Sequence, residues 1–421
     1  MIPPDLRPNI YHLIMDIAWF GVLNGSVLAF LSIYAARIGA SALQLGMITA
    51  VPAVVNLGLA LPSGDWLARR DLFKSIFLSS LFSRVFYLLL IPLPVLFPFP
   101  VQVIVIILIT LLLNIPGTAL AVGFTAMYAE AVPIQWRGHA ASARNVFFAI
   151  FTMVTSLLCG FILESTPFLL GYQIVFGLGF LGAMASSAHL FFVRPAVRRA
   201  TLASLPQPVA EGGASGATTV AESPRIPARR RRWLNIDLKT DVIRGPYGRV
   251  VLLFFFFHLT QYLAIPIFPL YQVDQLQFTD QVISLGTALY YIAVFLGATQ
   301  LVKLVTRFGN QKIVGLGVML LGGYPAMLVF SQPLVMYILT SIVGGLAWAL
   351  INGGMYNYLL ERVEEDKRPA SLAWYNIALN AAILAGSVVG PVIAGGVGLA
   401  AALLLFAGLR FVAGFSIFKW G

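Results

Sequence analysis

A short charged stretch decides the fold: Leu61-Pro-Ser-Gly-Asp-Trp-Leu-Ala-Arg-Arg-Asp-Leu-Phe-Lys74 lies between two long apolar runs. The runs, residues 43–62 and 75–97, are each near the ~20 residues that an α-helix needs to cross a bilayer's hydrocarbon. The stretch therefore predicts a tight turn between two membrane helices. Its basic residues, Arg69, Arg70 and Lys74, place the turn on the cytoplasmic side, because Lys and Arg accumulate there.

The composition indicates a polytopic membrane protein. Of the 421 residues, 59% are hydrophobic and only 10% are charged, with a mean hydropathy of +0.88. A soluble domain carries roughly 25% charged residues. The net charge of +11 does not indicate nucleic-acid binding, because the basic residues lie in turns on one side of the membrane. The single cysteine, Cys159, excludes a disulfide within the monomer.

The continuous apolar runs predict twelve membrane spans. All are expected to be helical, because lipid offers no partner to an unpaired backbone group, and a barrel is excluded because the runs do not alternate. The first run is too long for the core of a signal peptide and is expected to be retained. The approximate limits are 10–35, 43–62, 75–97, 101–129, 141–164, 168–193, 250–273, 280–304, 312–331, 334–360, 371–396 and 398–419.

The basic residues are distributed asymmetrically over these spans. An even number of spans puts both termini on one side, and the excess of Lys and Arg makes that side cytoplasmic. On the opposite side only Arg37 is basic. The sequence therefore predicts an integral protein of a bacterial-type inner membrane with both termini in the cytoplasm.

A long polar segment divides the spans six and six. The expected domains are a six-helix bundle at 1–193, a cytoplasmic linker at 194–249 and a second six-helix bundle at 250–421. Residues 205–227 of the linker are expected to be flexible, because they are rich in Pro, Gly, Ala and Ser and cannot bury enough apolar surface to fold. The arginine run at 229–232 is expected to contact anionic lipid headgroups.

The two halves of the chain repeat each other. A second charged turn, Val302-Lys-Leu-Val-Thr-Arg-Phe-Gly-Asn-Gln-Lys312, lies after the eighth span, as the first turn lies after the second span. Further residues of the first half recur 231 positions later in the second half. These pairs are Glu130 and Glu361, Arg137 and Arg368, Asn145 and Asn376, and Ser156 and Ser387.

The turns and the repeat resemble the major facilitator superfamily, whose loop signature after helix 2 reads Gly-x-x-x-Asp-Arg-x-Gly-Arg-Arg/Lys. The positions that fit are Asp65, Arg69 and Arg70 in the first copy and Arg307 and Gly309 in the second. Trp66 and Thr306 depart from the signature. The resemblance implies an all-α fold of two pseudo-symmetric six-helix bundles, which expose a midplane site alternately to each side, with the fitting residues in gating loops.

The resemblance also implies that spans 1, 4, 7 and 10 line a central cavity. Each of these spans carries polar or aromatic residues at helical spacing. For any one of them the alternative is a hydrogen bond that holds two helices together. The candidate substrate-cavity residues are Phe20, Asn24, Asn114, Thr118, His258, Gln261, Tyr262, Trp348, Asn352 and Tyr356.

Three ionisable residues within the predicted spans are functional candidates, because charge inside a bilayer is costly. They are Asp16, Arg84 and Arg410. Asp16 is the candidate for proton coupling, and the alternative is an ion pair with Arg84 that braces the first bundle. His258 is a second proton candidate, because the ordinary pKa of His is near neutrality, and its alternative is a packing role.

These features predict a secondary active transporter that moves a small neutral, amphipathic or weakly cationic organic molecule, with efflux as the expected direction. The alternatives are uptake of a neutral metabolite, or a sensor, scaffold or lipid-moving protein with the same fold. No enzyme activity, cofactor or metal is expected, because the sequence has no phosphate-cradling Gly-Lys-Ser/Thr loop and no metal-ligand cluster. The expected partners are the substrate, protons and membrane lipids, and the protein is expected to be a monomer.

The topology can be tested with single-cysteine reporters in a Cys159→Ala background. Reporters at Ser41, Pro98 and Pro167 should react with an impermeant thiol reagent from outside intact cells. A reporter at Gly213, in the predicted linker, should be shielded. Exterior labelling at Gly213 would contradict the arrangement of six spans on each side of a cytoplasmic linker.

Overall fold

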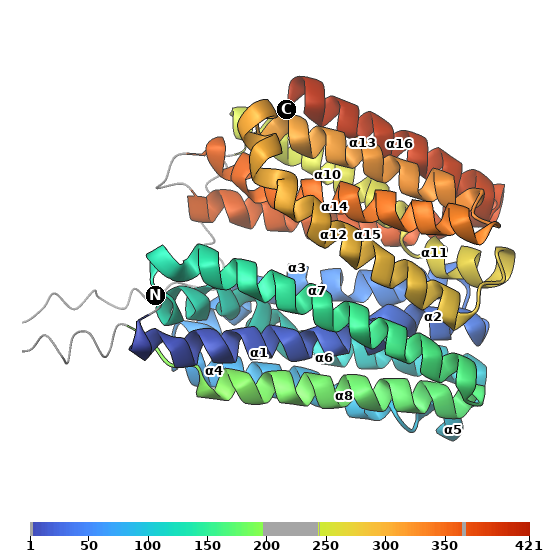
Figure 1. Cartoon of the computed structure of the whole chain (residues 1–421), viewed down its shortest axis with the longest axis horizontal. Helices are drawn as coiled ribbons and strands as arrows, with labels where there is room; N and C mark the ends of the chain where they lie inside the picture. The colour runs from blue at the N-terminus through green and yellow to red at the C-terminus, as the bar shows by residue number, and fades with distance from the viewer. Residues whose placement is uncertain (1–2, 197–242, 244, 364–367) are drawn as a thin grey trace, which may run out of the picture.

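The computed structural model describes residues 3–196, 243, 245–363 and 368–421, and over these ranges the chain is helical and contains no strand. Twelve helical segments in the described ranges are long and apolar enough to cross a membrane. They form two bodies that lie side by side (Figure 1). The prediction of twelve spans is therefore confirmed. Residues 205–227 and 229–232 of the predicted linker lie outside the described residues.

The first body, here called the N-bundle, contains the first six spans. The first span is one continuous rod of α-helix, π-helix and α-helix. A short 3-10 turn, Pro4–Leu6, precedes it. The elements are α1 (Arg7–Leu23), η2 (Asn24–Leu28), α2 (Ala29–Arg37), α3 (Ala42–Leu67), α4 (Leu72–Val85), η3 (Phe86–Leu90), α5 (Leu93–Leu96), α6 (Phe99–Ala131), α7 (Ile134–Ser165) and α8 (Phe168–Phe192).

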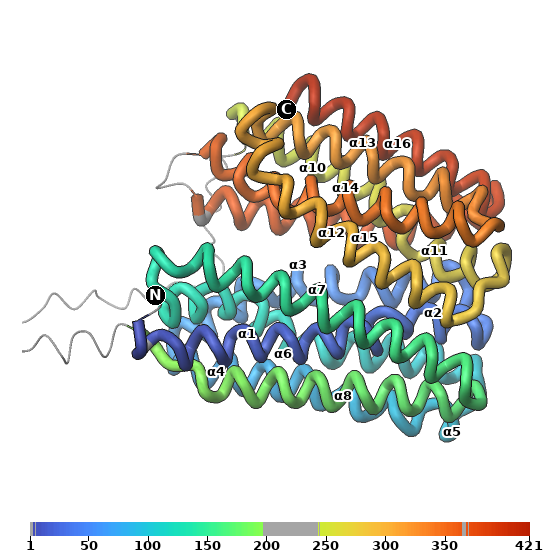
Figure 2. Tube along the Cα trace, viewed as in Figure 1, coloured from blue at the N-terminus to red at the C-terminus, as the bar shows by residue number. Residues whose placement is uncertain are grey.

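The second body, the C-bundle, contains the other six spans. Figure 2 shows its path from yellow to red beside the blue-to-green N-bundle. The elements are α10 (Pro246–Ala264), α11 (Ile267–Leu270), η5 (Tyr271–Gln275), α12 (Asp280–Phe308), α13 (Asn310–Val329), α14 (Leu334–Glu361), α15 (Arg368–Val397) and α16 (Leu399–Trp420).

Two spans are interrupted where the sequence predicts unbroken helices. The third span was expected at 75–97, but its α-helix ends at Val85, continues as 3-10 helix to Leu90 and resumes only as α5. The seventh was expected at 250–273, but α10 ends at Ala264 before Pro266. Proline explains both breaks, because it lacks the N–H that an α-helix needs and its ring crowds the preceding turn. Pro92 lies at the first break.

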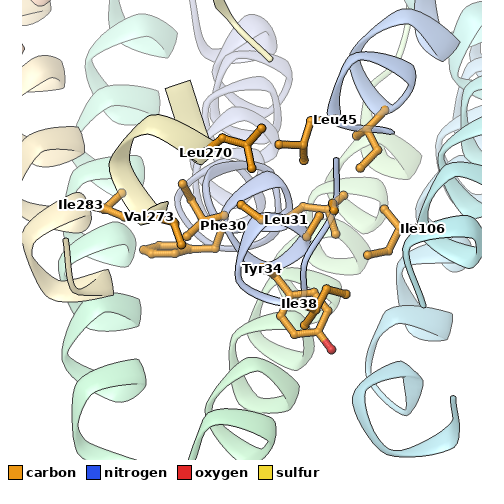
Figure 3. Packing of buried hydrophobic residues seen from close by; sticks show 14 of the residues in the cluster. Phe30, Leu31, Tyr34, Ile38, Leu45, Ile106, Leu270, Val273 and Ile283 are labelled. Atoms are coloured by element: carbon orange, nitrogen blue, oxygen red, sulfur yellow. The ribbon is translucent and has the colours of Figure 1, made fainter. Parts of the chain in front are cut away.

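The two bundles meet most closely at one end. Both chain termini lie at the opposite end, so the two ends are here called the termini end and the far end (Figure 1). One cluster of buried apolar residues contains side chains from both bundles, and it lies toward the far end. In Figure 3, Phe30 and Leu31 of the N-bundle lie beside Leu270 and Val273 of the C-bundle. The other two buried clusters each belong to a single bundle.

Small residues allow this close approach. A Cβ atom added to Gly46 of α3 would lie 2.1 Å from the carbonyl oxygen of Ser387 in α15. A Cβ atom added to Gly160 of α7 would lie 2.0 Å from the hydroxyl oxygen of Ser284 in α12. Glycine at these two positions therefore sets the spacing between the bundles in the far half of the molecule.

Replacing Gly46 with alanine should loosen this junction. In Gly46→Ala the new methyl group would overlap the backbone of α15, and overpacking of this kind costs about 1–3 kcal/mol. Thermal unfolding of the purified protein in detergent measures the effect. Gly58→Ala is the matched control in the same helix, because nothing lies within 4 Å of its new Cβ atom. Equal unfolding temperatures for the two variants would show that the contact at Gly46 does not hold the bundles together.

Candidate substrate cavity and charged centre

A cavity of about 300 Å³ lies between the bundles, adjacent to the apolar closure of the far end. The N-bundle contributes residues from α2 and α3 to its wall, and the C-bundle contributes residues from the broken seventh span and from α12, α13 and α14. The lining residues are Ala29, Ser32, Ile33, Thr49, Ile265, Pro266, Phe268, Pro269, Gln272, Ile283, Gly286, Thr287, Tyr290, Tyr291, Tyr324, Tyr337 and Ser341.

Tyrosine is the most frequent residue type in the wall of this cavity. Four tyrosines of the C-bundle line it: Tyr290, Tyr291, Tyr324 and Tyr337. The amide nitrogen of Gln272 donates a hydrogen bond to the hydroxyl oxygen of Tyr337 at 3.3 Å. Among the described residues that form the wall, none is an Asp, Glu, Lys, Arg or His. The cavity can therefore offer hydrogen bonds and aromatic faces, but no fixed charge, to a bound molecule.

Asn24 is the predicted cavity residue that reaches this wall. Its side-chain nitrogen donates to the hydroxyl oxygen of Tyr291 at 2.8 Å, across the junction of the bundles. Phe20, one turn earlier, stacks on Phe148 at a centroid distance of 6.1 Å. Phe148 in turn meets Tyr291 edge-on at 5.9 Å. The side of span 1 that the sequence selects thus faces the C-bundle next to the cavity.

The two candidates of span 4 lie in different environments. The Thr118 hydroxyl donates to the side-chain oxygen of Asn56 at 2.7 Å. The nitrogen of Asn56 donates to the side-chain oxygen of Asn380, in the C-bundle, at 3.3 Å. This chain of three side chains links the two bundles. Asn114 bonds instead to the carbonyl of Thr110, one turn back in its own helix, at 2.7 Å.

The candidates of span 7 lie inside the C-bundle rather than on the cavity wall. His258 is buried, and its Nε2 lies 2.9 Å from the hydroxyl oxygen of Tyr375. The Tyr375 hydroxyl in turn contacts the sulfur of Met355 at 3.4 Å. Tyr262 packs against the backbone of α15 at Gly386. The buried hydrogen bond between His258 and Tyr375 is the contact expected if His258 holds helices together rather than carrying a proton.

The candidates of span 10 are also outside the lining of the cavity. Trp348 packs against the apolar interior of the C-bundle. Asn352 and Tyr356 are exposed, and Tyr356 meets Tyr375 edge-on at 6.2 Å. The residues of α14 that do line the cavity, Tyr337 and Ser341, lie nearer the start of this helix than the predicted candidates.

Asp16 lies at the centre of a buried charged cluster in the N-bundle. Its Oδ1 lies 3.7 Å from a guanidinium nitrogen of Arg84, and its Oδ2 lies 3.4 Å from a guanidinium nitrogen of Arg144. The Ser186 hydroxyl donates to Oδ1 at 2.5 Å. The side chains of Asp16, Arg84 and Arg144 are 4%, 7% and 11% exposed. The carboxylate therefore has two cationic partners and a hydroxyl donor.

Arg144 is the partner of Asp16 that the sequence does not reveal. It lies near the start of a predicted span, where an arginine is also expected as a topological signal, so no pattern distinguishes it. The structure gives it two further contacts. It donates to the carbonyl of Leu13 at 2.6 Å, and its guanidinium carbon lies 4.8 Å from the ring centroid of Phe124. A cation at this distance from an aromatic face is stabilised by it.

Arg410 is fully buried in the C-bundle and is held by backbone oxygens. Its guanidinium donates to the carbonyls of Thr260 and Gln261, each at 3.1 Å, and to the carbonyl of Leu321 at 3.2 Å. Its side chain forms no ion pair within the part of the chain that the structure describes. The two carbonyls of α10 lie in its last turn, where a cation is favoured. Arg410 therefore stabilises the end of α10 at the break before Pro266.

The predicted gating loops lie at the termini end, and their charged residues are exposed. Arg70 stacks on Trp66 with its guanidinium carbon 5.0 Å from the ring centroid, and Arg307 stacks on Phe308 in the same way at 5.2 Å. Asp65 and Arg69 line a groove of about 950 Å³ between α3, α4 and α6.

Two residues of these loops have clear local roles. Asp71 accepts a hydrogen bond from the backbone N–H of Lys74 at 2.9 Å and so caps α4. Gly309 joins α12 to α13 with φ +81°, a conformation that glycine adopts without strain. The agreement of Gly309 with the family signature therefore has a backbone reason.

The described ranges thus form twelve helices of membrane-spanning length, arranged in two bundles with a cavity at their junction. The family model described as Major Facilitator Superfamily matches residues 250–420, which is the C-bundle. Among curated proteins no sequence matches the chain. The family match lies in the C-bundle, and the twelve-helix fold of the described residues is that of the Major Facilitator Superfamily.

Solved structures similar to this chain share its fold over the full length. A nucleoside transporter, NupG, is 15% identical with a TM-score of 0.63, and the match covers 100% of both chains. A D-xylose-proton symporter is 15% identical with a TM-score of 0.68, over 99% of this chain and 97% of the other. A bacterial homologue of the iron transporter ferroportin, in an inward-facing state, is 12% identical with a TM-score of 0.67 over 100% of both.

Replacing Asp16 should destabilise the N-bundle. In Asp16→Asn the guanidiniums of Arg84 and Arg144 lose their shared carboxylate, and breaking a buried ion pair costs roughly 3–5 kcal/mol in soluble proteins. The thermal unfolding temperature of the purified protein should fall. Adding Arg84→Gln should restore part of the loss, because one unpaired charge is removed. Asp65→Asn, which changes an exposed carboxylate, is the control and should unfold like the wild type.

If Asp16→Asn unfolded at the wild-type temperature, the cluster would not brace the N-bundle.

Proposed function

We propose that this protein transports a small neutral, hydrogen-bonding organic molecule by alternating access, and that the substrate binds in the tyrosine-lined cavity. The observation that carries the proposal is the wall of this cavity, which presents four tyrosines and no charged side chain among its described residues. A volume of about 300 Å³ lies at the lower end of the range for small-molecule sites, roughly 300–1,000 Å³. A weakly cationic substrate is less well matched, because no carboxylate lines the wall.

The similar proteins support a polar, uncharged substrate. One of them is a nucleoside transporter, and another is a symporter of D-xylose and protons. Sugars and nucleosides are rich in hydroxyl groups, which tyrosine hydroxyls can both donate to and accept from. Of the functions weighed from the sequence, transport of a neutral metabolite therefore has the most support in the cavity.

We further propose that the termini end faces the cytoplasm, as the distribution of basic residues predicts, and that the structure corresponds to a cytoplasm-facing state. The apolar contact shared by the bundles lies toward the far end, where it would separate the cavity from the outside. The exposure of Asp65, Arg69 and Arg70 at the termini end agrees with this state, because a gating loop is released when its side is open.

Asp16 is the proposed proton site, and its arginine partners define how coupling would work. A proton on Asp16 would cancel the negative charge that Arg84 and Arg144 share, so protonation would change how α4 and α7 are held against α1. His258 is less suited to coupling, because it is buried against Tyr375 away from the cavity wall. We further propose that the functional unit is a monomer in the inner membrane.

Transport in proteoliposomes and ligand-induced thermal shifts test the function. A library of nucleosides, sugars and neutral drugs should contain a compound that raises the unfolding temperature of the wild type. In Tyr291→Phe the affinity for that compound should fall by roughly tenfold, because the proposed hydrogen bond between the Tyr291 hydroxyl and the substrate is lost. Tyr11→Phe is the control, since Tyr11 is exposed and remote from the cavity.

The same vesicles decide the direction. Efflux, the direction expected from the sequence, requires substrate to move against an inward proton gradient, and uptake requires it to move with one. A compound that binds Tyr291→Phe as tightly as the wild type would show that the substrate site lies elsewhere.

A further inference from the structure

A carboxylate and a guanidinium from different bundles meet at the far end. The Nε atom of Arg37 lies 2.9 Å from Oδ1 of Asp280. A terminal nitrogen of the same guanidinium donates to the carbonyl of Phe278 at 2.8 Å. The Tyr172 hydroxyl donates to Oδ1 of Asp280 at 3.1 Å. This contact therefore joins α2 and α8 of the N-bundle to the start of α12 in the C-bundle.

The helix ends favour this pair of charges. Arg37 is the last residue of α2 and Asp280 is the first residue of α12. A helix carries partial negative charge at its C-terminus and partial positive charge at its N-terminus, so each side chain has the sign that its own helix stabilises. The backbone of α12 is capped by the hydroxyl of Thr279, which accepts from the N–H of Val282 at 3.3 Å. The Asp280 carboxylate is thus available for Arg37.

The position of Arg37 in the sequence is a second, independent reason to expect a role for it. It is the only basic residue on the side of the predicted spans opposite the termini, where Lys and Arg are otherwise excluded. The structure shows what it contacts: a carboxylate of the other bundle. Glu164, at the end of α7, is a further carboxylate near Asp280 and forms no ion pair in the described part of the chain.

We propose that Arg37 and Asp280 are gating residues that lock the far end closed, and that their separation is a required step when that end opens. This inference rests on the alternating-access function proposed above, because only that motion parts the two residues. Their side chains are 22% and 11% exposed, so water reaches the pair only partly in the closed state. Removing one charge leaves the other poorly solvated when closed but fully solvated when open, which shifts the population toward the open state.

The test measures access to the cavity from outside. A reporter cysteine replaces Ser32, which lines the cavity, in a Cys159→Ala background, and intact cells are treated with an impermeant thiol reagent without substrate. Arg37→Gln and Asp280→Asn should each raise the labelling rate about fivefold or more, the range of typical coupling energies between sites. Asp274→Asn, a neutralised exposed carboxylate at the same end, is the matched control and should label like the reporter alone.

Two further variants test whether the charge pair itself controls labelling: one exchanges the two charges, and the other removes only the hydroxyl of Tyr172. The double variant Arg37→Asp with Asp280→Arg should bring labelling partly back down; recovery is incomplete because each charge then opposes its helix end. Tyr172→Phe keeps the ion pair and should change labelling less than either neutralised variant. The lock is overturned if Arg37→Gln and Asp280→Asn label at the reporter's rate, or if the exchanged pair labels as fast as the single variants.

These outcomes are separate from those that test the substrate site. Labelling is read without substrate, so tight binding of the compound to Tyr291→Phe would overturn the proposed cavity and leave the lock intact. Unchanged labelling in the Arg37 and Asp280 variants would overturn the lock and leave the cavity intact. If one single variant does not reach the membrane, the other single variant and the charge exchange still decide the question.

Discussion

The hydrocarbon of a membrane offers no hydrogen bonds, and this constraint governs every polar contact inside the protein. Each buried charge of the described chain is met by groups on neighbouring helices. Asp16 has two guanidiniums and a hydroxyl, and Arg410 has three backbone carbonyls. The apolar surface of the helices cannot by itself hold them together, because lipid is equally apolar. Close backbone contact at glycine and these polar contacts therefore fix which helices are neighbours.

The same constraint divides the molecule into a rigid part and a part suited to movement. Within the N-bundle, Asp16 joins three helices through side chains that are almost entirely buried. Three of the side-chain contacts between the bundles are more exposed: Asn24 with Tyr291, Asn56 with Asn380, and Arg37 with Asp280. Water can replace the partners in the second group much more easily than in the first. In the proposed alternating access, each bundle would thus move as a unit while the contacts between the bundles exchange.

The sequence predicts the number, order and type of the spans, because continuous apolar runs leave the backbone no alternative to a helix. It also identifies Asp16 and the face of span 1 that carries Asn24. It does not predict the interruptions of the α-helix near Pro92 and Pro266, because a membrane helix can also accommodate a proline with a kink. It does not reveal Arg144 as a partner of Asp16, because the two are 128 residues apart and arginine near a span end has a topological explanation.

The sequence also does not predict which residues line the cavity. His258, Trp348 and Asn352 have the spacing expected of a cavity, but spacing defines only one side of a helix and not what that side contacts. The tyrosines of α12 lie in the eighth span, which the resemblance drawn from the sequence does not place at the cavity. Their role follows from the distance between the bundles, which small residues such as Gly160 determine. This information is tertiary and has no local signal in the chain.

The bond between Asn24 and Tyr291 has a consequence for the discrimination between solutes. A molecule that enters between the two side chains separates a donor from an acceptor, and in a dry site an unpaired polar group costs about 1–3 kcal/mol. A solute that supplies an acceptor for Asn24 and a partner for the hydroxyl restores both interactions, whereas a hydrocarbon of the same shape restores neither. In the proposed transport cycle, the empty cavity would therefore disfavour apolar molecules through the bond between Asn24 and Tyr291.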